Sequence, residues 1–88
     1  MMPITEYFKF LHLNYSKIVG FIQELEKQKE DCLFYVEEAM QDSQSLVEQI
    51  KDLVFEYHLD LEYSNRAENL LDKIYSVYWK YKQKSDRI

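Results

Sequence analysis

The fold is decided by the stretch Leu46-Val47-Glu48-Gln49-Ile50-Lys51-Asp52-Leu53-Val54-Phe55-Glu56-Tyr57. Within it, a spacing of four, three and four residues places four apolar side chains on one side of an α-helix: Leu46, Ile50, Leu53 and Tyr57. Val47 and Val54 widen this apolar side. A helix that is apolar along one side is not stable alone in water, so this helix needs another surface to cover it.

The same spacing continues in both directions, from Ile4 to Tyr81, and we call the positions that it picks out the seam. The seam has 23 positions, and all but four are apolar: the exceptions are Lys29, Ser43, Asp60 and Ser64. Side chains in a strand alternate with a period of two, so a register of this length predicts helices. We therefore expect an all-α chain with the seam buried, including Ile22, Val36, Ile50 and Ile74.

The chain is expected to reverse direction within Gln41-Asp42-Ser43-Gln44-Ser45, which is poor in strong helix formers. Ser45 and Glu48 have the spacing of a capping box, which marks a helix start. The sequence thus predicts a single domain, residues 1–88, folded as a long antiparallel helical hairpin. Its arms span about residues 4–41 and 46–84, with the turn at about 42–45.

In such a hairpin Lys29 and Asp60 face each other across the seam. An oppositely charged pair in a partly buried seam adds little stability, but it penalises other registers. We therefore expect these two side chains to lie within salt-bridge distance.

Two other architectures remain open. A break near 63–65 would divide the second arm and give a three-helix bundle, because Asn65 and Glu68 also have capping-box spacing. A single hairpin would also leave many apolar residues that lie off the seam exposed to solvent. Two hairpins that close a four-helix bundle would cover them, so we expect a homo-oligomer. The off-seam residues are Phe10, Leu13, Phe34, Phe55, Leu59 and Trp79.

Composition and charge narrow the classes of function. The net charge of the 88 residues is −5, with −9 between Gln23 and Glu62 and +4 between Lys73 and Ile88. The acidic middle disfavours a nucleic-acid partner, which requires clustered positive charge. The apolar runs are too short to span a membrane, and the first residues do not resemble a signal peptide. One cysteine, Cys32, allows no internal disulfide. We therefore expect a cytoplasmic protein without a nucleic-acid or membrane partner.

No catalytic, cofactor or metal site is expected. His12 and His58 are the only histidines, and neither belongs to the Glu-x-x-His pattern of di-iron bundles. A chain with one glycine cannot supply a Gly-rich phosphate loop. Glu37 and Glu38 are adjacent in sequence, so on a helix their side chains diverge and do not form an acid–base pair. We therefore predict that the protein is not an enzyme.

One short segment resembles a known motif. Ser64-Asn65-Arg66-Ala67-Glu68-Asn69 resembles the inhibitory motif of Fic-domain antitoxins, Ser/Thr-x-x-x-Glu-Gly/Asn. The resemblance covers six of the 88 residues and implies an inhibitor of an adenylylating toxin. It would make Glu68 the residue that obstructs ATP binding and Ser64 its partner at the helix start, with Asn69 in the last motif position.

The surplus of apolar side chains, the acidic middle and the lack of catalytic motifs favour a protein–protein interaction module. Such a module would be a small regulator, inhibitor or chaperone-like protein that binds a protein partner through an apolar helical face. The alternative is a homodimeric scaffold with a purely structural role. The residues expected to bind a partner are Phe34, Glu37, Glu38, Phe55, Leu59 and Trp79.

Overall fold

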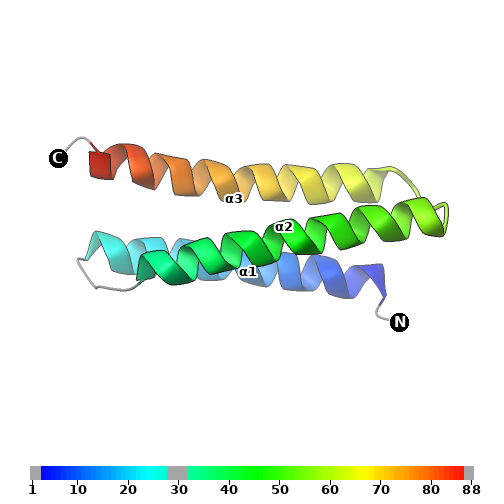
Figure 1. The fold of residues 1–88 in the computed structure, drawn as a ribbon, viewed down its shortest axis with the longest axis horizontal. Coiled ribbons are helices and arrows are strands. Elements are labelled where there is room, and N and C mark those ends of the chain that lie inside the picture. Colours follow the sequence, from blue (N-terminus) through cyan, green and yellow to red (C-terminus); the bar gives the residue numbers. More distant parts are fainter. Residues whose placement is uncertain (1–2, 28–31, 87–88) are drawn as a thin grey trace.

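The computed structural model describes residues 3–27 and 32–86, and side chains as far as residue 83. Three helices account for nearly all of these residues: α1 (Ile4–Glu26), α2 (Cys32–Glu56) and α3 (Glu62–Asp86). Successive helices run in opposite directions, and each contacts the other two (Figure 1). They form a rod of 48 × 22 × 14 Å. The described part of the chain is thus all-α, as the spacing predicts.

The core is built mostly from the seam, but burial of the whole seam is wrong: Tyr57 and Asp60 are exposed, because both lie in the reversal that follows α2. Ile22, Val36, Ile50 and Ile74 are all buried, which confirms the expectation for these positions. Val47 and Val54 are the buried residues that lie off the seam. Both are on α2, where they widen the apolar side of the helix as the sequence predicts. The buried set is Phe8, Leu11, Ile18, Ile22, Val36, Ala39, Ser43, Val47, Ile50, Val54, Ala67, Ile74 and Tyr78.

The predicted turn at 42–45 is wrong, because α2 continues through it without a break. Ser43 is 0% exposed, and its hydroxyl donates a 2.7 Å hydrogen bond to the carbonyl oxygen of Ala39 in the same helix. A small polar side chain that is satisfied in this way can lie in a core. Ser45 is an exposed residue in the middle of the helix and does not begin one. The long two-arm hairpin is therefore wrong as well.

The chain reverses before and after α2. The first reversal lies between Lys27 and Cys32. Lys29 lies outside the described residues, so its predicted pair with Asp60 does too. The second reversal spans residues 57–61 and precedes the predicted break near 63–65. Asn65 is not a helix cap, since it lies in the first turn of α3 and its N–H bonds to the carbonyl of Leu61 at 3.1 Å. The three-helix arrangement is therefore present, but with different helix boundaries.

The burial of Ser43 allows the continuity of α2 through residues 42–45 to be tested by stability measurements. Ser43→Leu should lower the free energy of unfolding by about 1–3 kcal/mol, because extra methylene groups overpack a filled core. The exposed neighbour provides the control: Gln44→Leu should change stability by less than about 0.5 kcal/mol. Urea denaturation of both variants measures the difference. Equal tolerance of the two leucines would contradict a buried, helical position 43.

Candidate functional site

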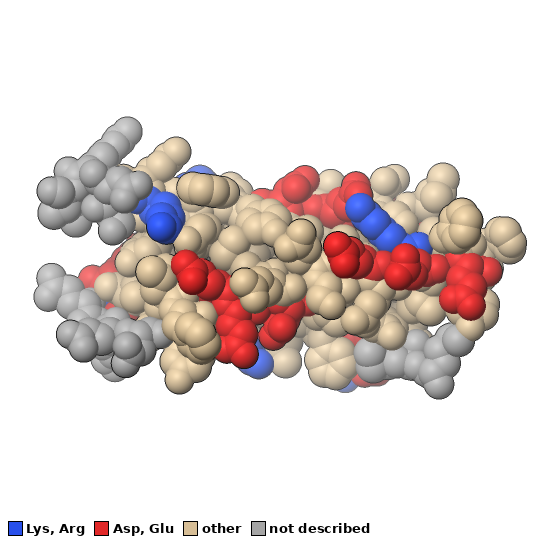
Figure 2. All heavy atoms as spheres, viewed as in Figure 1, with Lys and Arg blue, Asp and Glu red and all other residues tan. Residues whose placement is uncertain are grey.

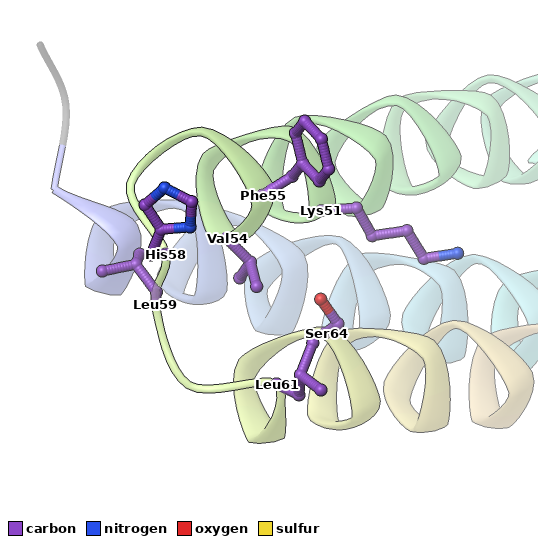
Figure 3. Close-up of a pocket in the computed structure, with 7 residues that line it drawn as sticks. All are labelled: Lys51, Val54, Phe55, His58, Leu59, Leu61 and Ser64. Carbon is purple, nitrogen blue, oxygen red and sulfur yellow. The ribbon is translucent and has the colours of Figure 1, made fainter.

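A groove lies at the corner where α2 passes into α3, and we call it the corner groove (Figure 3). It measures about 520 Å³ and opens to solvent. Val54 is buried and Leu59 is half-buried against the core, so these two residues form an apolar floor. The groove therefore brings together Phe55 and Leu59, two of the residues that the sequence singled out. It is lined by Lys51, Val54, Phe55, His58, Leu59, Leu61 and Ser64.

The end of α2 explains why Leu59 faces inward. His58 has a φ of 52°, in the left-handed region, and the N–H of Leu59 bonds to the carbonyl of Val54 at 3.0 Å. This six-to-one hydrogen bond after a left-handed residue is the pattern of a Schellman motif. The motif folds Leu59 back onto the last turn of the helix. A non-glycine residue in this conformation is strained, although histidine tolerates it better than most.

The start of α3 is held by Asp60. Its Oδ1 atom accepts a 2.9 Å hydrogen bond from the N–H of Glu62, and its carbonyl accepts one from Tyr63 at 3.1 Å. A carboxylate at a helix N-terminus also interacts favourably with the helix dipole. Hydrogen bonds therefore fix the backbone on both sides of the corner. Leu61, which follows Asp60, is left pointing outward.

Two large apolar side chains stand at the rim of the groove. The Phe55 side chain is 85% exposed and Leu61 is 71% exposed, the two highest values among large apolar residues that the structure describes. Phe55 projects from α2, whereas Leu61 precedes the first turn of α3 (Figure 3). Exposed apolar side chains that gather around an apolar floor are typical of a binding surface.

The rim is also acidic. Between residues 52 and 62 there are four carboxylates and no lysine or arginine. All four are exposed: Asp52, Glu56, Asp60 and Glu62. Figure 2 shows that acidic side chains also lie along α2 and reach the end where α2 meets α3. Lys51 lines the groove, but its ammonium group pairs with the carboxylate of Glu68 on α3.

The remaining aromatic residues expected to bind a partner lie at the other end of the rod. Phe34, near the start of α2, is 67% exposed and packs edge-on against Tyr35. Trp79, in the C-terminal half of α3, is 58% exposed and packs edge-on against Tyr78. Figure 1 places both helix regions away from the corner. The residues that the sequence proposed as one binding face therefore belong to two separate regions.

Glu37 and Glu38 lie on opposite sides of α2. Glu37 lines a shallow groove beside Tyr75 of α3, whereas Glu38 lines another beside Lys17 and Phe21 of α1. Their side chains therefore diverge, as expected for adjacent helical residues.

The six-residue motif that resembles the Fic antitoxins occupies the first two turns of α3. Ser64 is half-buried and lines the corner groove, whereas Asn69 is exposed. Glu68 is about half exposed and is engaged by Lys51. The motif thus lies beside the corner groove, with its glutamate held in an ion pair within the chain.

The described residues contain no group of three or more His, Cys, Asp or Glu side chains placed to hold a metal ion. None of their buried side-chain polar atoms lacks a hydrogen-bond partner. No described helix combines the length and the hydropathy needed to cross a membrane. Comparison of the chain with protein-family models, curated proteins and solved structures found no match.

The strain at the corner can be measured. His58→Gly should raise the free energy of unfolding by about 0.5–1 kcal/mol, because glycine has no Cβ to oppose a positive φ. His58→Ala is the matched control: it removes the imidazole but keeps the Cβ, so it should bring no such gain. Chemical denaturation of both variants tests the assignment. Equal stability of the glycine and alanine variants would contradict the left-handed conformation.

Proposed function

We propose that the chain is a non-enzymatic protein–protein interaction module that binds a partner protein through the corner groove. It would act as a small acidic cytoplasmic regulator, inhibitor or chaperone-like protein. A single cysteine, Cys32, fits a reducing compartment. The observation that carries the proposal is the exposure of Phe55 and Leu61 on either side of an apolar floor.

The energetics favour binding at this site. Fully burying a leucine or phenylalanine side chain is worth about 1.5–3 kcal/mol, so these two side chains are strong candidates for anchors. The chain's own core does not need them, because both point into solvent. The backbone that carries them is fixed by the Schellman motif and by Asp60. A partner would therefore meet a preformed site and would lose little entropy in ordering it.

Two substitutions at the rim test the proposal. The double variant Phe55→Ser/Leu61→Ser should fold with an unchanged melting temperature and lose capture of the cellular partner. Capture is measured by quantitative mass spectrometry after pull-down from the native lysate.

The matched control is Phe34→Ser, which removes an exposed phenylalanine from the other end of the same helix. This variant should capture the same partner as the wild type. Loss of capture with Phe34→Ser, together with normal capture by the double variant, would place the binding surface at the other end and contradict the proposal.

A homodimer is the second candidate, and a different observation favours it. Leu33, Phe34 and Tyr35 form an exposed apolar run at the start of α2, far from the corner groove. Two copies that pair through this run would bury its aromatic rings and leave both corner grooves open. Such a dimer would act as a scaffold and would also be compatible with partner binding.

Sedimentation velocity tests the dimer. The wild type should sediment as a dimer at micromolar concentration, Phe34→Ser should sediment as a monomer, and Phe55→Ser should remain dimeric. A wild type that stays monomeric at about 100 μM, a concentration at which even a weak dimer would be detectable, would exclude this candidate.

A further inference from the structure

We infer that the corner groove takes a cationic amphipathic segment of a partner protein. Apolar side chains of that segment would lie on Phe55, Leu61 and the floor, and its lysines or arginines would lie over the acidic rim. The inference rests on the proposed function, since it names the chemistry of the partner at the same site.

Carboxylates bracket each exposed apolar side chain of the rim. Asp52 lies one turn before Phe55 on α2, and Glu56 follows Phe55 directly. Leu61 stands between Asp60 and Glu62. An apolar contact at either residue therefore brings the neighbouring part of the partner close to two negative charges. This arrangement favours apolar residues flanked by cations and disfavours flanking acids.

No lysine or arginine that the structure describes forms an ion pair with these four carboxylates. Lys51 is the closest lysine in sequence, and it pairs with Glu68, which is not part of the rim. Arg66, near the start of α3, has its guanidinium 4.9 Å from the centre of the Phe8 ring. Both cations are thus engaged elsewhere within the chain. The rim carries a net charge of −4 over residues 52–62, apart from any charge on His58.

The acids on α2 are badly placed for folding. Glu56 is the last residue of α2 and Asp52 lies one turn earlier, whereas no basic residue occupies the last turn. Carboxylates at a helix C-terminus are repelled by the negative end of the helix dipole. Asp60 and Glu62, in contrast, lie at the favourable N-terminal end of α3. A bound cation would interact favourably both with Asp52 and Glu56 and with the helix terminus.

A second copy of the chain is the competing occupant. The part of α3 from its middle to its C-terminus carries Lys73, Lys80 and Lys82 as well as the exposed Trp79. This region is itself cationic and aromatic, so head-to-tail association of two copies would also satisfy the groove. We favour a different protein because two of these lysines are already engaged within the chain: the Nζ of Lys73 lies 5.1 Å from the centre of the Tyr15 ring, and that of Lys82 lies 5.9 Å from the centre of the Tyr78 ring.

The probe is a synthetic amphipathic peptide of leucine and lysine, about 14 residues long, which gives about four helical turns. It carries a fluorescent label, and a leucine–glutamate peptide of the same pattern is the control. Fluorescence anisotropy at low salt should show saturable 1:1 binding of the lysine peptide and none of the glutamate peptide. Phe55→Ser/Leu61→Ser should weaken binding at least about tenfold. Higher ionic strength should weaken it too.

Variants that neutralise acids on α2 distinguish an effect of the rim carboxylates from an effect of the net charge of the protein. Asp52→Asn/Glu56→Gln should weaken binding several-fold and reduce its salt dependence. The matched control, Glu37→Gln/Glu38→Gln, removes two charges from the same helix at its other end and should bind like the wild type. Equal effects of the two pairs would overturn the inference, because binding would then follow net charge alone. Self-association of the wild type that Phe55→Ser abolishes would also overturn it, in favour of a second copy.

The cellular partner distinguishes failure of the inference from failure of the proposed function. Capture that depends on Phe55 and Leu61 but is unchanged in Asp52→Asn/Glu56→Gln would overturn the cationic partner and leave the interaction module standing. Capture that does not depend on Phe55 and Leu61 would overturn both.

Discussion

The burial of α2 between two other helices is the interaction on which the rest of the structure depends. Val36, Ile50 and Val54 are buried on this helix, and its apolar face is wide enough to pack against both α1 and α3. The side of α2 that faces away from the other two helices is exposed and highly charged. The six acids of the helix, against one lysine, give it a net charge of −5, equal to that of the whole chain. Packing therefore determines both where the core lies and where the acidic surface lies.

Most of the core register could be read from the sequence, because burial inside a helix follows side-chain spacing. The prediction failed at Tyr57 and Asp60, which are exposed because the chain reverses there. The reversals themselves could not be read from the sequence. Gln41, Asp42, Gln44 and Ser45 are polar because they lie on the exposed side of a helix, and Ser43 satisfies its hydroxyl within that helix. A polar run of this kind resembles a turn.

The reversal at 57–61 was missed for the opposite reason: its sequence lacks the usual signals of a turn. It has no glycine or proline, and its left-handed residue is His58. The left-handed position of a Schellman motif is usually a glycine, which would have marked the helix end in the sequence.

The candidate site was predicted in part. Phe55 and Leu59 drew attention because they are apolar and off the seam, but Leu61 was missed because it stands between two acids and before a helix start. The false turn also misplaced Phe34. In the expected hairpin it would lie close to Phe55. In one continuous helix the two are 21 positions apart, which corresponds to about 30 Å at 1.5 Å per residue. Because the predicted hairpin was wrong, residues from two separate regions were predicted to form one binding face.

The direction of the three helices has a practical consequence for work with the protein. The first turn of α1 lies at the same end of the rod as the corner groove, whereas α3 finishes at the opposite end (Figure 1). A tag, fluorophore or surface linker attached ahead of Pro3 would sit beside Phe55 and Leu61 and compete with any ligand there. Immobilisation through the last turn of α3 would instead orient the molecule with its groove facing away from the support.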